Sequence, residues 1–214
     1  MTTALRPGKT DERRFVIDLP AFESIVQALR AAGYADADIQ WSENCGPPAC
    51  AEDFARETIF VICNSGMKNT VARGIFNRVC GALARGESAR TVFNHPGKAR
   101  AIDEIWARRE EYFAGFLSAG DPLEYCASIP WIGNITKYHL AKNFGAQVAK
   151  PDVHLQRLGA LEDSTPQALC ERLAQQSGFK VATVDVLLWR ACAVGIIDSR
   201  TGAIHVPRQM VAAN

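Results

Sequence analysis

The chain lacks several features that would place it outside the ordinary soluble proteins. It has no uninterrupted apolar run near about 18 residues, so no membrane span is predicted. Its first residues, Met-Thr-Thr-Ala-Leu-Arg-Pro-Gly-Lys, contain no apolar core of a signal peptide. There is no Cys-x-x-Cys pair and no closely spaced cysteine quartet, so no zinc or iron–sulfur site is predicted. We therefore expect a cytoplasmic protein without a metal cofactor.

The seven cysteines are odd in number and scattered, as expected for reduced thiols. Cys45 and Cys50 flank Gly-Pro-Pro-Ala, and the alternative for this pair is a local disulfide or half of a metal site.

The sequence also has little net charge. Its 24 Lys and Arg residues nearly balance 23 Asp and Glu residues, giving a formal charge of +1, which is not typical of a strongly basic nucleic-acid binder. Basic residues do recur locally, and a solvated surface of mixed sign explains most of them. An enzyme needs only one basic face, so this balance leaves a DNA partner open.

What the sequence does contain is a series of helical patterns. Apolar residues recur with a spacing of three or four, and turn or capping residues separate the segments. Helices are predicted over residues 21–32, 52–63, 70–84, 98–117, 121–128, 135–143, 164–178 and 181–194, with one more beginning near residue 153. The sequence thus predicts an all-α fold of eight to nine helices. We expect a flexible lead-in over 1–14, a single helical domain over 15–214, and a small hairpin within 197–206.

The most informative stretch joins two short helices over residues 121–145. Its turn is Ile129-Pro-Trp-Ile-Gly133, and a short loop after the second helix then delivers one acid, Asp152, to the next helix. Consecutive backbone N–H groups at a helix N-terminus, with the positive end of the helix dipole, suit a phosphate oxygen.

This order resembles the helix-hairpin-helix base-excision DNA glycosylases, over roughly residues 52–195 and most specifically over 129–158. The resemblance implies a double-stranded DNA partner, whose phosphate the hairpin holds through Gly133, Asn134, Lys137 and Lys142. Hairpins of this family often share a monovalent cation with the phosphate, and no other cofactor is implied. Trp131 stands where the family usually has the first glycine; the alternative is an ordinary helical hairpin with a buried tryptophan.

The resemblance assigns catalysis to Asp152. Bifunctional members carry a lysine two residues after the second hairpin glycine, and that position is Ile135 here. Lys137 lies about 200° further round the helix, so it does not substitute. A monofunctional enzyme is implied, in which Asp152 stabilises positive charge at the sugar or deprotonates water. The alternative is that Asp152 only caps the next helix.

Other residues are expected around an extruded base. In the loop between residues 63 and 70, Ser65 is nearest the family's wedge position and Lys68 adds charge for DNA. In the pocket, Asn64 offers a donor and an acceptor to the base edge, and Met67 is an alternative, soft wedge. Small polar residues are also common in ordinary loops. On and after the hairpin, the pocket residues expected are Ile135, Tyr138, His139, Lys150 and His154.

Two enzymatic hypotheses follow from the resemblance. The first is a monofunctional DNA glycosylase that flips a damaged or modified base and cuts its N-glycosidic bond. The second is a related phage branch linked to hypermodified thymine, which would place the protein in the host cytoplasm. There an amine or amino acid would replace the phosphate or pyrophosphate of an activated 5-hydroxymethyluracil in DNA, with Lys68 or Lys150 holding the leaving group. A third reading is a DNA-binding module without chemistry. We expect a monomer.

Overall fold

The computed structural model describes residues 15–205, and in this range the protein is built from helices. The helices are α1 (Leu19–Ala31), α2 (Ala35–Asn44), α3 (Ala51–Asn64), α4 (Asn69–Ala84), the 3-10 helix η1 (Ala89–Thr91), α5 (Pro96–Ala107), α6 (Arg109–Ser118), α7 (Pro122–Ser128), α8 (Thr136–Asn143), α9 (Val153–Leu161), α10 (Pro166–Ser177) and α11 (Val181–Ala193). The predicted all-α class is confirmed. The predicted lead-in over 1–14 lies outside the described residues.

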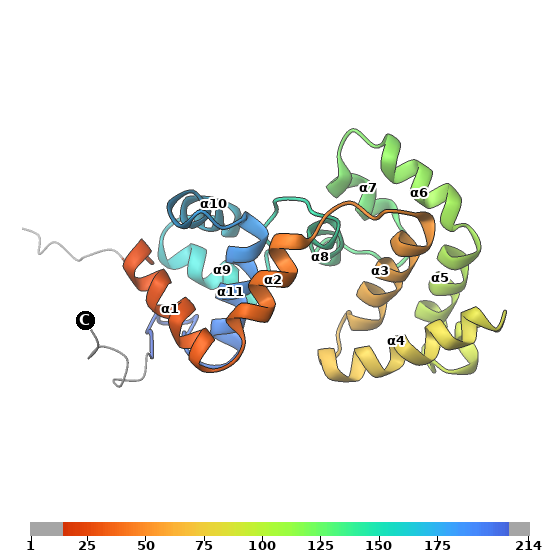
Figure 1. The fold of residues 1–214 in the computed structure, drawn as a ribbon, viewed down its shortest axis with the longest axis horizontal. Helices are drawn as coiled ribbons and strands as arrows, with labels where there is room; N and C mark the ends of the chain where they lie inside the picture. Colours follow the sequence, from red (N-terminus) through yellow and green to blue (C-terminus); the bar gives the residue numbers. More distant parts are fainter. Residues whose placement is uncertain (1–14, 206–214) are drawn as a thin grey trace, which may run out of the picture.

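The helices form two lobes (Figure 1). The first lobe contains α1, α2, α9, α10 and α11, and the second contains α3 to α8. Each lobe has its own cluster of buried apolar side chains: Phe22, Leu155 and Leu187 belong to the first, and Phe54, Ile102 and Leu140 to the second. The apolar face of α1 is thus covered by helices from the other end of the described chain. Two linkers, 45–50 and 144–152, connect the lobes.

Local signals place most helix ends where the sequence predicts them. The carboxylate of Asp121 accepts hydrogen bonds from the N–H groups of Leu123 and Glu124 at the start of α7. Thr165 caps α10 in the same way, and Gly178 ends that helix with φ 78°. These caps satisfy backbone groups that a helix end leaves unpaired, which is why they mark boundaries from sequence alone.

Two predictions about the helices are wrong. The single helix expected over 98–117 is broken at Arg108, which has φ −108° and ψ 24°. An unbroken helix of that length would extend about 30 Å, whereas the break lets α5 and α6 both pack against the shorter α3. In addition, eleven α-helices stand within residues 15–205, against the eight to nine expected.

The helix that the sequence patterns miss is α2. It has no apolar stripe, and only Ala35 and Ser42 are buried. Tertiary contacts hold it instead: the Arg190 guanidinium of α11 donates to both carboxylate oxygens of Asp38 at 2.8 and 3.0 Å. The Ser42 hydroxyl also donates to Thr183 Oγ1 at 2.9 Å.

The predicted tail hairpin is present only as one antiparallel bridge between Ile197 and Ile204, within the residues described.

The end of α8 packs closely against the linker between α2 and α3. Gly145 has φ 88°, and a Cβ placed on it would lie 2.8 Å from the Cα of Gly46.

Gly145→Ala is therefore expected to lower the free energy of unfolding by about 2–4 kcal/mol, from left-handed strain together with backbone overlap. Urea unfolding measures this difference. The matched control is Gly178→Ala, which has a similar φ of 78° and no atom within 4 Å, and should cost only about 1–2 kcal/mol. Equal losses in the two variants would contradict the close approach.

Candidate functional site

The hairpin formed by α7 and α8 has its unusual backbone at Trp131. This residue has φ 67°, a left-handed conformation that glycine adopts most readily and that costs other residues about 1–2 kcal/mol. Its indole packs over Gly97, where an added Cβ would lie 2.5 Å from Cζ3, and its edge meets the His95 ring with centroids 5.2 Å apart. Trp131 is 45% exposed, so the alternative of a buried tryptophan is wrong.

The hairpin leaves a partly open helix N-terminus. The N–H of Gly133, expected at a phosphate, donates to Thr136 Oγ1 at 2.7 Å. Asn134 and Ile135 are exposed, and their N–H groups donate to no acceptor among residues 15–205. The N–H groups still open to an anion therefore belong to residues after Gly133. Ile135, at the position where the resemblance would place a lysine in bifunctional members, is 42% exposed.

The two hairpin lysines differ in their surroundings. Lys137 Nζ donates to Glu124 Oε1 at 2.7 Å, which raises the pKa of the lysine. Lys142 is buried and forms an ion pair with Asp185 of α11. Lys142 was expected at the DNA phosphate, but its ammonium is buried and paired with a carboxylate 43 residues away.

The Lys142–Asp185 pair joins the two lobes. Both side chains are nearly fully buried. Asp185 Oδ1 also accepts the Lys150 backbone N–H at 2.7 Å, which ties the loop leading to Asp152 to α11. Burial raises the pKa of Asp185, and the neighbouring ammonium of Lys142 opposes that effect. The sequence reasoning missed Asp185, although a lone acid in the apolar stretch 181–194 is a signal for a buried partner.

Asp152 is held at the first turn of α9. Its Oδ1 accepts the N–H groups of His154 at 2.9 Å and Leu155 at 3.1 Å, so the alternative role as a helix cap is confirmed. Its own N–H donates to the Lys150 carbonyl at 2.8 Å. The second oxygen, Oδ2, receives no hydrogen bond from any described residue. One oxygen is thus fixed and the other remains available to a reacting group.

Two predicted pocket residues, Lys150 and His139, lie in the same polar neighbourhood as Asp152. Burial lowers the pKa of Lys150, while the Asp152 carboxylate opposes the shift. Burial, followed by the positive charges of Lys142 and Lys150, lowers the pKa of His139 to about 3. The imidazole of His139 is therefore neutral at pH 7. Clusters of groups with shifted pKa values are common at active sites, although structural ion pairs produce them too.

The low pKa of His139 has a consequence for stability. The unfolded imidazole takes up a proton near its ordinary pKa of 6.5, whereas the folded one does so only near 3. Stability should therefore fall as the pH drops from about 6.5, approaching a slope of about 1.4 kcal/mol per pH unit from this group. His139→Phe is expected to reduce that slope in urea unfolding between pH 4 and 7. The control is His205→Gln at an exposed position; the prediction fails if the two variants retain equal slopes.

The predicted base-facing loop lies between α3 and α4. The Ser65 carbonyl accepts from the ammonium of buried Lys98 at 2.6 Å, and Met67 packs against the second core. Lys68 is exposed, while Asn64 Oδ1 is buried without a hydrogen-bond partner among the described residues. No hydrogen bond or ion pair among the described residues joins this loop to Asp152.

The remaining predicted pocket residues, Tyr138 and His154, contact other partners. Tyr138 is half-buried, with the Lys137 ammonium 5.7 Å from its ring centroid. The His154 Nδ1 lies 3.0 Å from Ser199 Oγ, in the segment that follows α11. The structure thus brings Asp152, His139, Lys142 and Lys150 together, but not the α3–α4 loop.

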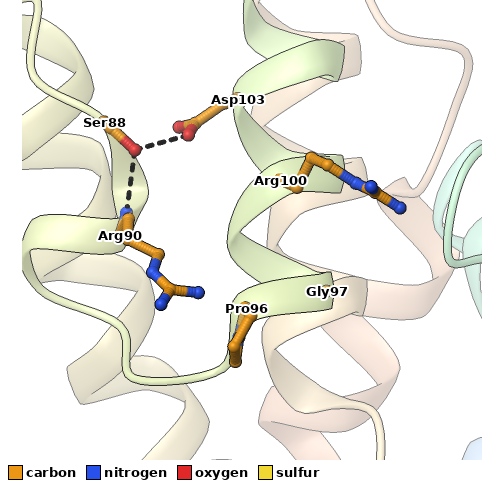
Figure 2. A pocket seen from close by; sticks show the side chains of 6 residues that line it. All are labelled: Ser88, Arg90, Pro96, Gly97, Arg100 and Asp103. Atoms are coloured by element: carbon orange, nitrogen blue, oxygen red, sulfur yellow. Dashed lines mark hydrogen bonds between the residues drawn. The ribbon is translucent and has the colours of Figure 1, made fainter.

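A hollow of about 520 Å³ adjoins the hairpin on the second lobe. Figure 2 shows its lining, with Arg90 reaching toward Pro96 and Arg100 pointing outward from α5. The Asp103 carboxylate accepts hydrogen bonds from the Ser88 hydroxyl at 2.5 Å and from the Ala89 N–H at 2.7 Å. Gly97, under the Trp131 indole, lies at the boundary between hollow and hairpin. The sequence reasoning did not single out this pair of arginines.

Some features are absent within residues 15–205. No group of three or more His, Cys, Asp or Glu side chains is placed to hold a metal ion. All seven cysteines are free thiols, so the alternative disulfide between Cys45 and Cys50 is not formed. No helix in this range has the length and apolarity to span a membrane.

The chain was compared with protein-family models, with curated proteins and with solved structures, and none of the three comparisons found a match.

Proposed function

We propose that the protein is an enzyme of the helix-hairpin-helix DNA glycosylase type that acts on a base flipped out of double-stranded DNA. The observation that carries this proposal is the position and hydrogen bonding of the Asp152 carboxylate. Its carboxylate follows the hairpin in the expected order, one oxygen is fixed by two backbone N–H groups, and the other receives no hydrogen bond from the described residues. A carboxylate held in this way can act without reorganising.

The favoured reaction is cleavage of an N-glycosidic bond by a monofunctional glycosylase. Asp152 Oδ2 would stabilise positive charge developing at the sugar, or take a proton from the attacking water. Ile135 at the position of the family's lysine supports the monofunctional form, since no amine stands there to form an imine.

DNA would be held mainly on the second lobe. The open N–H groups of Asn134 and Ile135 offer donors to one phosphate, and Arg90 and Arg100 supply positive charge in the hollow that Gly97 borders under the Trp131 ring. We also propose that a monovalent cation binds between this phosphate and the backbone carbonyls of the hairpin.

The second candidate is the DNA hypermodification transferase. The nitrogen of an amine or amino acid would attack the 5-methylene carbon of activated 5-hydroxymethyluracil. The carbon–oxygen bond would break, phosphate or pyrophosphate would leave, and Asp152 would accept the proton from nitrogen. A basic hollow that adjoins Asp152 at His154 favours this candidate, because the reaction must accommodate a released phosphate.

Mass spectrometry of nucleosides digested from treated DNA distinguishes these reactions. The substrates are duplexes with common lesions and duplexes with phosphorylated 5-hydroxymethyluracil, with an amino-acid mixture present. A free base and an abasic site would support the glycosylase. A heavier thymidine without base loss would support the transferase. If neither product forms with any substrate while the duplex is bound, the enzymatic proposal is wrong and a DNA-binding module remains.

A further inference from the structure

A second hollow, of about 330 Å³, lies in the first lobe where α9 meets the chain that follows α11. Four basic side chains line it, and they come from two separate segments. His154 and Arg157 are three residues apart on α9, so they share one face of that helix. Arg200 and His205 come from the chain after α11. The basic character therefore results from the tertiary fold and not from a run of charge in the sequence.

The segment after α11 is held in place by backbone contacts. The Gly202 N–H donates to the Asp198 carbonyl at 2.8 Å, which closes the turn that carries Arg200. The His205 N–H donates to the Ile196 carbonyl at 2.7 Å, which brings His205 back beside the start of that turn. Both basic side chains of this segment are thus presented to the hollow by an ordered backbone.

The hollow carries an excess of positive charge. Neither Arg157 nor Arg200 forms an ion pair with a carboxylate among the described residues. The one acid in the lining, Asp198, accepts the Arg200 backbone N–H at 2.9 Å, and that bond is the main cause of its lowered pKa. Among the lining residues, two guanidinium groups face one carboxylate, so the lining is positive even when both imidazoles are neutral.

His154 is oriented for a ligand. Its Nδ1 lies 3.0 Å from the hydroxyl of Ser199, and Ser199 is 4% exposed. This contact fixes the ring and leaves Nε2 for another partner. A histidine ring held at one nitrogen by a buried hydroxyl resembles the supported donors of ligand sites more than a solvated surface side chain.

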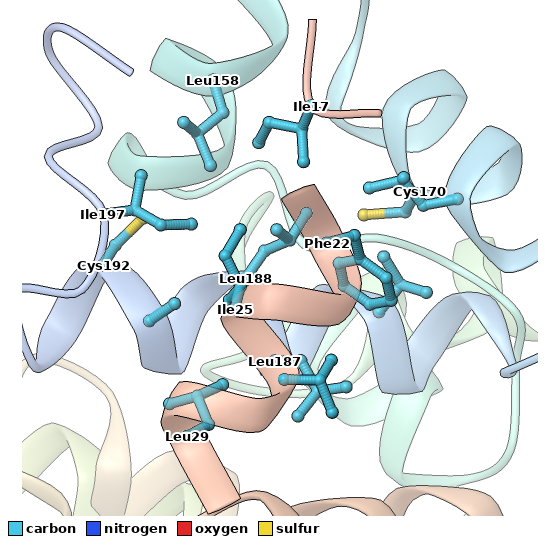
Figure 3. Close-up of a cluster of buried hydrophobic side chains, with 14 of the residues drawn as sticks. Ile17, Phe22, Ile25, Leu29, Leu158, Cys170, Leu187, Leu188, Cys192 and Ile197 are labelled. Carbon is cyan, nitrogen blue, oxygen red and sulfur yellow. The ribbon is translucent and has the colours of Figure 1, made fainter. Parts of the chain in front are cut away.

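The hollow adjoins the candidate catalytic acid. The His154 backbone N–H donates to Asp152 Oδ1 at 2.9 Å. Cys192 lines the hollow, and Figure 3 shows it beside Ile197 at the edge of the first core. Burial, and then the charges of Asp152 and Asp198, raise the pKa of the Cys192 thiol to about 12.

We propose that this hollow is a phosphate-binding site next to Asp152, formed by Arg157, Arg200, His154 and His205. Arginine pairs with phosphate through two parallel hydrogen bonds, and imidazole nitrogens add further donors. The volume is at the lower end of small-molecule sites, which suits a phosphate, a pyrophosphate or the phosphate end of a larger ligand. A phosphate bound here would lie beside the carboxylate that the transferase reaction uses.

Isothermal titration with inorganic phosphate and with pyrophosphate, at constant ionic strength set by chloride, tests the site without requiring turnover. We expect wild-type protein to bind at least one of the two anions. The double variant Arg157→Gln/Arg200→Gln should bind it about tenfold or more weakly, because two charge-assisted contacts are lost. The control, Arg73→Gln/Arg78→Gln, removes the same charge from the exposed face of α4, away from the lining of this hollow, and should retain the affinity.

The proposal is overturned if neither anion binds wild-type protein, if the first double variant binds as well as wild type, or if both variants weaken equally. Thermal unfolding of each variant verifies that it is folded. As a second measure of binding, the NMR signals of the His154 and His205 rings should shift when phosphate is added. Competition with a short DNA duplex identifies where the bound phosphate comes from. If the duplex displaces the free anion, the site binds a DNA phosphate; if the duplex and the anion bind together, the site takes a small ligand. Failure of this binding test would leave the glycosylase proposal standing, because that reaction releases no phosphate.

Discussion

Asp152→Asn is expected to reduce turnover by about 10²- to 10⁴-fold while leaving the fold and DNA binding nearly unchanged. Asparagine caps helices as well as aspartate, so its amide oxygen can still accept the N–H groups of His154 and Leu155. The amide cannot take a proton from water or from an amine, and it cannot balance positive charge at the sugar. The rate of product formation under single-turnover conditions, measured by mass spectrometry, reports the loss.

Asp121→Asn is the matched control for this substitution. Asp121 caps α7 through two backbone N–H groups, in the same way that Asp152 caps α9, and its carboxylate stands outside the polar neighbourhood of Asp152. Both variants should melt within a few degrees of wild type, and only Asp152→Asn should lose turnover. Activity retained by Asp152→Asn would remove Asp152 from the chemistry and leave it only as a cap.

Lys142→Met is expected to lower the free energy of unfolding by about 3–5 kcal/mol. The substitution keeps the length of the side chain but leaves the Asp185 carboxylate buried without its ammonium partner. An uncompensated buried charge costs several kcal/mol, and Asp185 reduces this cost only by taking up a proton. Urea unfolding at pH 7 gives the difference, and the loss should shrink at lower pH as Asp185 is protonated.

The double variant Lys142→Met/Asp185→Leu shows how much of that loss comes from the unpaired charge. It should recover much of the stability, since a buried pair replaced by apolar groups of similar volume is often neutral. Recovery should be incomplete, because the Lys150 N–H loses the acceptor that Asp185 provides. The control Arg30→Met breaks the exposed pair with Asp36 and should cost at most about 1 kcal/mol. Similar losses from the two single variants would show that the inter-lobe pair is not buried in solution.

This ion pair also has a consequence for the candidate site. It joins α8, which the hairpin opens, to α11 in the other lobe, and through the Lys150 N–H it holds the loop that carries Asp152. The hairpin and the acid are therefore fixed to each other across the lobes. A variant that breaks the pair should impair turnover together with stability, whereas Asp152→Asn should affect turnover alone.

The sequence by itself determined the helical class, most helix ends and the order of hairpin and acid. Those features are local: the caps at Asp121, Asp152 and Thr165 and the glycine at Gly178 act on backbone groups within a few residues. An apolar stripe with helical spacing likewise depends only on the residues of its own segment. The placement of the first lobe's helices around one core is not local, and the sequence patterns did not reveal it.

The tertiary structure decided everything that depends on partners far apart in the chain. α2 is held by Arg190, 152 residues from Asp38, and Lys142 is turned inward by Asp185, 43 residues away. The break at Arg108 and the basic hollow at His154 likewise arise where separate segments meet. A charged side chain has the same sequence signature whether it faces solvent or a buried counter-charge, because its environment is created only when the lobes assemble.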